Sequence, residues 1–229
     1  MADDDTLNPG YPDYALCCHK YQFRQDQVNT QCLDWSRALV RKYVERVKNG
    51  IVVEIGLFGG ATLLDLYPIA KANGTKVIGI DPFDQIKIFN GKPESNTKQL
   101  MIEETRKLYT FNRENLLNII QKYGLGDTIT VYPETSAEAV ANFANNSINV
   151  LHIDGDHSAD GVYSDLSKFY PKMVKGDSTA LKGKQKRGVI IGDDYNWQSV
   201  QIGLNRFCQE KGLKFKTVLE NRKFIIRIS

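Results

Sequence analysis

Long hydrophobic runs are missing from this sequence of 229 residues. No apolar stretch reaches the roughly 20 residues that a helix needs to cross a bilayer, so we expect no membrane span and no membrane partner. Residues 1–5 are mostly acidic, and no apolar segment follows them. We therefore expect no signal peptide and a cytoplasmic location.

The sequence also has few cysteines and a small net charge. The four cysteines are Cys17, Cys18, Cys32 and Cys208. None of them forms a C-x-x-C pair or has a histidine at zinc-finger spacing, and a chain of this size can bury a core without disulfides, so we expect reduced thiols. The 30 basic residues exceed the 27 acidic ones by only 3, an excess too small to indicate nucleic-acid binding by itself.

The sequence does contain a regular alternation of apolar runs and segments with helical periodicity. Its 41% hydrophobic and 25% charged residues are typical of a globular domain. The apolar runs are 51–55, 76–80, 128–132, 148–153, 188–191, 215–219 and 223–228. The predicted helices are 31–48, 61–73, 97–123 with a break near Thr110, 136–144, 160–170 and 197–211. Apolar strands separated by helices predict a parallel sheet covered on both faces.

The last two runs are joined by the tight turn Glu220-Asn221-Arg222. Because a parallel crossover needs a longer connection, these runs must form an antiparallel hairpin at one edge of the sheet. The prediction is an α/β fold with a doubly wound, mostly parallel seven-stranded sheet and a C-terminal antiparallel hairpin. We expect one domain over residues 31–229, preceded by an N-terminal arm over residues 1–30. Functional loops should follow the carboxyl ends of the first five strands.

The loop after the first run, residues 54–60, contains glycines but not the spacing of a dinucleotide-binding fingerprint. In G-x-G-x-x-G the second glycine lets the backbone approach a pyrophosphate, and here that position is Phe58, which would crowd the phosphates. A ligand with an amino-acid end and an adenosine end suits this loop better. Asp81 ends the second run, where a carboxylate can bind two ribose hydroxyls, and Ser136 follows the third run, where it could contact adenine. The alternative is a glycine turn that only packs a helix on a strand.

Aspartates follow the fourth and fifth runs. Asp154 and Asp156 stand in Asp-Gly-Asp-His, and Asp193 and Asp194 stand in Asp-Asp-Tyr. Because neighbouring parallel strands lie about 4.8 Å apart, we expect these side chains to share one small volume. Carboxylates this close repel one another, and a divalent cation removes the repulsion. Oxygen ligands favour Mg²⁺, Mn²⁺ or Ca²⁺ over zinc. The alternative is that these aspartates are solvated loop residues or helix N-caps.

The glycine loop and its partner residues resemble the class I S-adenosylmethionine-dependent methyltransferases, whose Rossmann-like sheet also ends in a hairpin. The resemblance covers roughly residues 50–229. It implies a cofactor site formed by Glu54, Gly56, Phe58, Gly60, Thr62, Asp81, Ser136 and Asp154. In that site Thr62 would lie near the cofactor's carboxylate, Asp81 would bind the ribose and Ser136 would border the adenine.

The aspartate pattern resembles the metal-dependent O-methyltransferases, most closely the sugar O-methyltransferases of macrolide and aminocoumarin antibiotic pathways. These share Asp-Gly-Asp and Asp-Asp-Tyr. The resemblance implies that Asp154, Asp193 and Asp194 bind the metal, and that Asp156 corresponds to a proposed general base. Catechol and caffeoyl-coenzyme A O-methyltransferases are more distant, since they have Asn where this chain has Asp194 and a catalytic Lys where it has His157.

The resemblance implies methyl transfer from S-adenosylmethionine to a hydroxyl of a sugar, in a glycan or glycoside, for example a deoxysugar such as rhamnose. Two vicinal hydroxyls can chelate Mg²⁺ or Mn²⁺, which lowers the pKa of one of them. A base about 3 Å away then takes the proton. Asp156 is the first candidate for this base, and His157 is the second because its ordinary pKa near 6.5 suits neutral pH. His152 is expected to be a buried imidazole.

Two other functions stay open: a catechol or phenolic O-methyltransferase, and a catalytically silent binding module with this fold. Trp197 either walls the acceptor site or belongs to the core, and Tyr195 has the same two interpretations. The loop 83–97 is long enough to cover an acceptor. The lysine-rich loop 172–187 is expected to be a solvated insertion. The aromatic residues of the N-terminal arm could cover the pocket, pack on the sheet edge or contact a second subunit of a homodimer.

Overall fold

The computed structural model describes residues 30–84, 96–176 and 187–228. These residues form a seven-stranded sheet with the order β3-β2-β1-β4-β5-β7-β6. The strands are β1 (Ile51–Ile55), β2 (Lys76–Ile80), β3 (Ile129–Tyr132), β4 (Val150–Ile153), β5 (Val189–Gly192), β6 (Phe215–Val218) and β7 (Lys223–Arg227). β1 to β5 are parallel and β7 runs antiparallel between β5 and β6, which confirms the predicted doubly wound sheet and its C-terminal hairpin.

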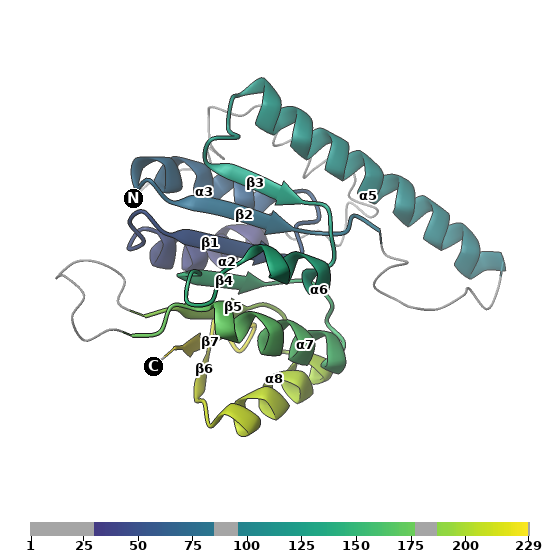
Figure 1. Cartoon of the computed structure of the whole chain (residues 1–229). Helices are drawn as coiled ribbons and strands as arrows, with labels where there is room; N and C mark the ends of the chain where they lie inside the picture. The colour runs from purple at the N-terminus through teal and green to yellow at the C-terminus, as the bar shows by residue number, and fades with distance from the viewer. Residues whose placement is uncertain (1–29, 85–95, 177–186, 229) are drawn as a thin grey trace.

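Helices cover both faces of the sheet (Figure 1). They are α2 (Thr30–Val44), α3 (Ala61–Ala72), α5 (Asn96–Lys122), α6 (Ser136–Ala139), α7 (Ala159–Phe169) and α8 (Gln198–Lys211), with the short 3-10 helices η1 (Val140–Asn142) and η2 (Tyr170–Lys172). In the view of Figure 1, α6 and α7 lie in front of the sheet and α2 lies behind it. No helix among the described residues is long and apolar enough to cross a membrane.

Two predicted helices differ from the observed ones. α5 has no break near Thr110, because neither glycine nor proline interrupts its 27 residues. The helix predicted at 136–144 is shorter: α6 begins with a capping box and soon gives way to η1. Phe143 then leaves the helix in an extended conformation, and its ring packs against Tyr132 and Phe169. Packing of this ring in the core therefore ends the helix early.

Side chains of each strand alternate between the two faces of the sheet, which produces two hydrophobic clusters. One cluster joins Val52 and Val150 to helices α2, α3 and α5. The other joins Val53 and Leu151 to helices α7 and α8. The strand order reverses between β1 and β4. In doubly wound sheets, ligands bind at the carboxyl ends of the strands beside such a reversal.

Several segments with predicted roles lie outside the described residues. They are residues 1–29 of the N-terminal arm, residues 85–95 of the 83–97 loop and residues 177–186 of the lysine-rich loop. Cys17 and Cys18 also lie there, whereas Cys208 is a free, buried thiol on α8.

Candidate active site

The loop after β1 is shaped by glycines in the left-handed backbone region. Gly56 has φ 86°, and a Cβ at this position would lie 2.0 Å from the carbonyl oxygen of Asp154. Gly60 has φ 77° and is the N-cap of α3. Both positions need glycine, because any other side chain would be strained and at Gly56 would also collide. The loop after β1 therefore packs directly against the loop after β4.

Asp81, just after β2, fixes the conformation of the same loop. Its Oδ2 accepts hydrogen bonds from the backbone N–H groups of Leu57 at 2.8 Å and Phe58 at 3.0 Å. Its Oδ1 accepts a third bond from the N–H of Phe83 at 2.7 Å. Burial raises the pKa of the Asp81 carboxyl, although the three N–H donors act in the opposite direction. Asp81 is thus a structural anchor of the loop, whatever it binds from outside.

Three further residues expected at the cofactor lie in or beside this loop. Glu54 is only 3% exposed, and its Oε2 has no hydrogen-bond partner among the described residues. Phe58 is 48% exposed, and its ring meets Tyr109 of α5 edge-on with centroids 5.8 Å apart. Thr62 is half-buried in the first turn of α3. The end of β1 thus carries a buried, unpaired acceptor, and the loop after it carries an exposed aromatic ring.

Ser136 opens α6, beyond the tip of β3. Its hydroxyl donates a hydrogen bond to the carboxylate of Asp165 on α7. Burial raises the pKa of Asp165 to about 6, although the bond from Ser136 acts to lower it. The Ser136 proton is therefore engaged inside the protein, and only the oxygen lone pairs stay available to a ligand.

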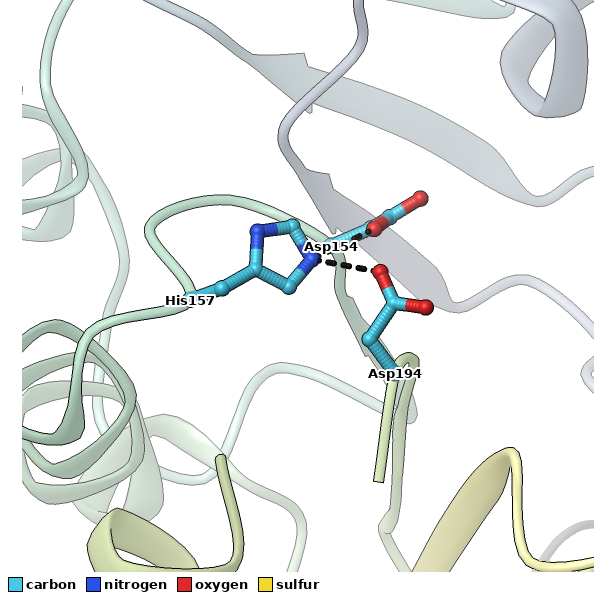
Figure 2. Close-up of side chains that lie close together, drawn as sticks. All are labelled: Asp154, His157 and Asp194. Atoms are coloured by element: carbon cyan, nitrogen blue, oxygen red, sulfur yellow. Dashed lines mark ion pairs between the residues drawn. The ribbon is translucent and has the colours of Figure 1, made fainter. Parts of the chain in front are cut away.

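Asp154, His157 and Asp194 form a side-chain cluster beyond the tips of β4 and β5 (Figure 2). His157 Nε2 lies 2.8 Å from Asp194 Oδ2 and 3.4 Å from Asp154 Oδ1. One possible ligand atom from each residue lies within 4.8 Å of the others. The carboxylates of Asp154 and then Asp194 raise the pKa of His157 to about 10, against the effect of its burial. The two carboxylates therefore attract positive charge into the cluster.

Asp193, the third predicted metal ligand, does not join this cluster. Its Oδ2 accepts a hydrogen bond from Lys223 Nζ at 2.6 Å, and its Oδ1 accepts one from the backbone N–H of Asp194 at 3.1 Å. Burial acts to raise the pKa of Asp193, but nearby positive charge, chiefly that of Lys223, outweighs burial and lowers the pKa. The structure thus brings Asp154 and Asp194 together, and it places His157 where Asp193 was expected.

Asp156, the first candidate for the general base, lies at the start of α7. Its Oδ1 accepts a hydrogen bond from the backbone N–H of Ser158 at 2.8 Å, and Ser158 is the N-cap of α7. A Cβ at Gly161 would lie 2.4 Å from the Asp156 carboxyl carbon. The Asp156 side chain therefore packs over the first turn of α7, beside the cluster and outside it.

Trp197 and Tyr195 have different surroundings. Trp197 is 52% exposed, and its ring centroid lies 5.1 Å from that of His157. Tyr195 packs against Phe215 of β6, with ring centroids 5.7 Å apart. Trp197 therefore flanks the cluster with an exposed aromatic face, while Tyr195 belongs to the packing of the terminal hairpin.

His152 is buried, as expected, and it contacts Lys223, a residue that the sequence analysis did not single out. His152 Nδ1 lies 3.1 Å from Glu54 Oε1, and its Nε2 lies 3.1 Å from Lys223 Nζ. Lys223 is completely buried at the start of β7. The one sequence signal was a lysine at the start of a strand whose next three residues are apolar, and lysines usually face solvent.

Comparisons with known proteins agree with this architecture. No curated protein matches the chain. The O-methyltransferase NovP has a similar structure (TM-score 0.64, 16% identity, 84% of this chain and 79% of that one). The S-adenosylhomocysteine-bound methyltransferase PaMTH1 of Podospora anserina is also similar (TM-score 0.58, 12% identity, 98% of this chain and 88% of that one). So is CalS11, a TDP-rhamnose 3'-O-methyltransferase of calicheamicin biosynthesis (TM-score 0.51, 13% identity, 87% of this chain and 81% of that one). At these identities the similarity establishes a shared fold.

The family described as "Methyltransferase domain" matches residues 53–195. This range is more than half of the chain and runs from the glycine loop to the Asp-Asp-Tyr segment. The chain therefore belongs to this methyltransferase family and is an S-adenosylmethionine-dependent methyltransferase.

Proposed function

We propose that this methyltransferase moves the methyl group of S-adenosylmethionine to a hydroxyl of a small-molecule acceptor, namely a sugar with vicinal hydroxyls. The observation that carries the proposal is the cluster of Asp154, His157 and Asp194 beside the glycine loop after β1. Because Gly56 packs against the Asp154 carbonyl, a donor on the loop and an acceptor on the cluster would be neighbours. Methyl transfer needs this proximity, since the oxygen must attack in line with the sulfur.

On the donor side, we assign the methionine end of the cofactor to Glu54, Gly56, Phe58, Gly60 and Thr62. The unpaired Oε2 of Glu54 suits a cationic group of that end. Asp81 Oδ2 accepts two backbone bonds and Oδ1 accepts one, which leaves a lone pair of Oδ1 for a ribose hydroxyl. Ser136 would border the adenine with its hydroxyl oxygen as an acceptor.

The cluster fits a divalent cation. His157 Nε2 is buried, and none of its close contacts has hydrogen-bond geometry although two carboxylate oxygens lie within 3.4 Å. Two carboxylates suit Mg²⁺ or Mn²⁺, and the imidazole favours Mn²⁺ of the two. Asp154, His157 and Asp194 would hold the ion, which when bound lowers the pKa of a coordinated hydroxyl and fixes its direction.

The hydroxyl proton needs an acceptor, and we assign this role to Asp156. One of its oxygens is bonded to the backbone of α7, which leaves the other for the proton. His157 is the second candidate, because a histidine that binds a cation through Nε2 cannot take a proton at the same atom. Without a cation, its pKa of about 10, raised by Asp154 and Asp194, keeps the ring protonated at neutral pH.

A sugar acceptor is supported by the fold shared with the rhamnose-modifying CalS11 and by the exposed ring of Trp197 beside the cluster. An aromatic face of this kind can stack on a sugar ring, and it can also stack on a phenol.

The test is a mass-spectrometric screen of the purified chain with S-adenosylmethionine, Mn²⁺ and two matched sets of acceptors. One set holds glycosides with vicinal hydroxyls together with their deoxy analogues, and the other holds catechols. We expect a single added methyl group on vicinal-diol glycosides and none on the deoxy analogues. Methylation of catechols alone would contradict the proposed acceptor.

A further inference from the structure

We propose that His152 and Lys223 are positioning residues that hold the donor side and the acceptor side of the active site in one bonded arrangement. They are the central members of a buried row, Glu54–His152–Lys223–Asp193, which joins the ends of β1, β4, β7 and β5. The proposal rests on the proposed function, in which Glu54 faces the methyl donor and Asp194, next to Asp193, faces the acceptor.

The register of the sheet places the four side chains of the buried row on one face. Glu54 of β1 and His152 of β4 are direct partners, and His152 lies opposite Ile191 of β5. Ile191 pairs with Ile225 of the antiparallel β7. Asp193 follows Ile191 by two residues, and Lys223 precedes Ile225 by two. Because side chains alternate with a period of two, Asp193 and Lys223 share the face of this pair.

Lys223 sets the direction of the hydrogen bonds in the row. Its ammonium group can only donate, and it lies 2.6 Å from Asp193 Oδ2 and 3.1 Å from His152 Nε2. His152 Nε2 must therefore accept, which leaves the ring proton on Nδ1, where it can be donated to Glu54 Oε1 at 3.1 Å. Lys223 thus orients the Glu54 carboxylate through the imidazole, and Glu54 Oε2 stays unpaired.

The other end of the row fixes the loop after β5. Asp193 Oδ1 accepts the backbone N–H of Asp194 at 3.1 Å, and the carbonyl of Arg222 accepts the N–H of Tyr195 at 2.9 Å. Asp194 has φ 50°, an uncommon conformation for a residue other than glycine, so it has to be held in place. Lys223 anchors Asp193 and thereby supports the conformation that puts the Asp194 carboxylate into the cluster.

A row of side chains that only stabilised the fold would be expected to pair every buried polar atom, but Glu54 Oε2 is unpaired. Glu54 is buried, and its Oε2 is the atom of the row that lacks a hydrogen-bond partner among the described residues. A buried acceptor without a partner costs free energy. A cationic group of the bound donor would remove this cost. Because Lys223 fixes the orientation of Glu54 through His152, donor binding should depend on Lys223, even though Lys223 does not touch the donor.

The test is a double-mutant cycle of Lys223→Met and Glu54→Gln in the full chain, with the Kd for S-adenosylmethionine measured by calorimetry and kcat measured by methyl transfer. We expect Lys223→Met to weaken donor binding at least fivefold and to lower kcat at least tenfold. In the Glu54→Gln background, Lys223→Met should change the donor Kd less than twofold, because Lys223 acts on the donor through Glu54. Lys223→Arg, which keeps a charged donor, should recover part of kcat.

Ile225→Val is the matched control, because Ile225 is a buried residue on the same strand and face. It should lower the melting temperature and leave the donor Kd unchanged. Additive effects in the cycle, or an unchanged donor Kd in Lys223→Met, would overturn the proposal. If Lys223→Met does not fold, His152→Leu takes its place in the cycle with the same expectations. A wild-type chain that binds no S-adenosylmethionine would overturn both proposals, whereas an additive cycle in an active enzyme would overturn only the buried row.

Discussion

The donor side and the acceptor side of the proposed site are built by different means. The loop after β1 is shaped by backbone, through glycines with positive φ and the N–H groups bonded to Asp81. The acceptor side consists of side chains beyond two strand tips, with an imidazole 2.8 and 3.4 Å from two carboxylates. The donor loop is therefore fixed before a ligand arrives, while under the proposed function the cluster gains further partners when the metal ion and the acceptor bind. Substitutions on the two sides should separate donor binding from turnover.

The largest effect is expected from Asp194→Asn on the acceptor side. Loss of this carboxylate should lower turnover on the order of 1,000-fold, beyond the roughly 10–100-fold typical of groups that only orient metal ligands. The Kd for S-adenosylmethionine, measured by calorimetry, should stay nearly unchanged. Asp160→Asn is the control, because Asp160 is an exposed aspartate paired with Arg206 on the surface. A matching loss of donor affinity in Asp194→Asn would break the separation between the two sides.

Asp156→Asn tests the proton acceptor. We expect kcat to fall by at least about 100-fold, the lower end of typical general-base effects. Donor affinity should again be retained, because the Asp156 carboxylate packs over α7. A fall in kcat of less than about tenfold would contradict the assignment of Asp156 as the base.

Gly56→Ala tests the contact between the two sides. Both Gly56 and Gly124 have positive φ, but a Cβ at Gly124 would meet nothing within 4 Å. Gly124→Ala should therefore lose only the roughly 1–2 kcal/mol of left-handed strain. Gly56→Ala adds a collision with Asp154, and we expect it to lose about 2 kcal/mol more in urea denaturation. Equal losses of unfolding free energy in the two variants would show that the loop after β1 is not in tight contact with the loop after β4.

The smallest effect concerns pH and the donor side. Asp165 has a folded-state pKa of about 6 against an ordinary value of 3.8, so the folded state binds this proton more tightly than the unfolded state. The resulting stabilisation is complete below pH 3.8 and is lost as the pH rises through about 6. Relative to Asp165→Asn, the wild type should lose about 1 kcal/mol of unfolding free energy between pH 5 and 7. A difference between the two proteins that does not change with pH would contradict the raised pKa.

Most of the fold follows from local sequence patterns. Apolar runs of four to six residues bounded by helical periodicity mark β1 to β5, and the four-residue connection between β6 and β7 is too short for anything but an antiparallel hairpin. The short α6 did not follow, because packing of Phe143 against residues distant in sequence ends it. Boundaries set by tertiary packing are invisible to periodicity.

The candidate site was predictable in its location and only in part in its members. Strand ends give the positions of Asp154 and Asp194, since both follow neighbouring parallel strands. Sequence alone could not separate Asp193 from Asp194, because their directions depend on the left-handed conformation of Asp194. Nor could it pair Asp193 with Lys223, 30 residues away, because that contact depends on the register of β7 beside β5.

The most direct test of hydroxyl methylation at the Asp154–His157–Asp194 cluster is turnover of a vicinal-diol glycoside after exhaustive chelation and after addition of Mn²⁺. Binding of Mn²⁺ to the chelated chain is measured alongside, in the wild type and in Asp194→Asn. We expect chelation to abolish methyl transfer, Mn²⁺ to restore it in the wild type, and Asp194→Asn to bind no Mn²⁺. Full turnover in the chelated wild type would contradict the proposed metal-assisted reaction.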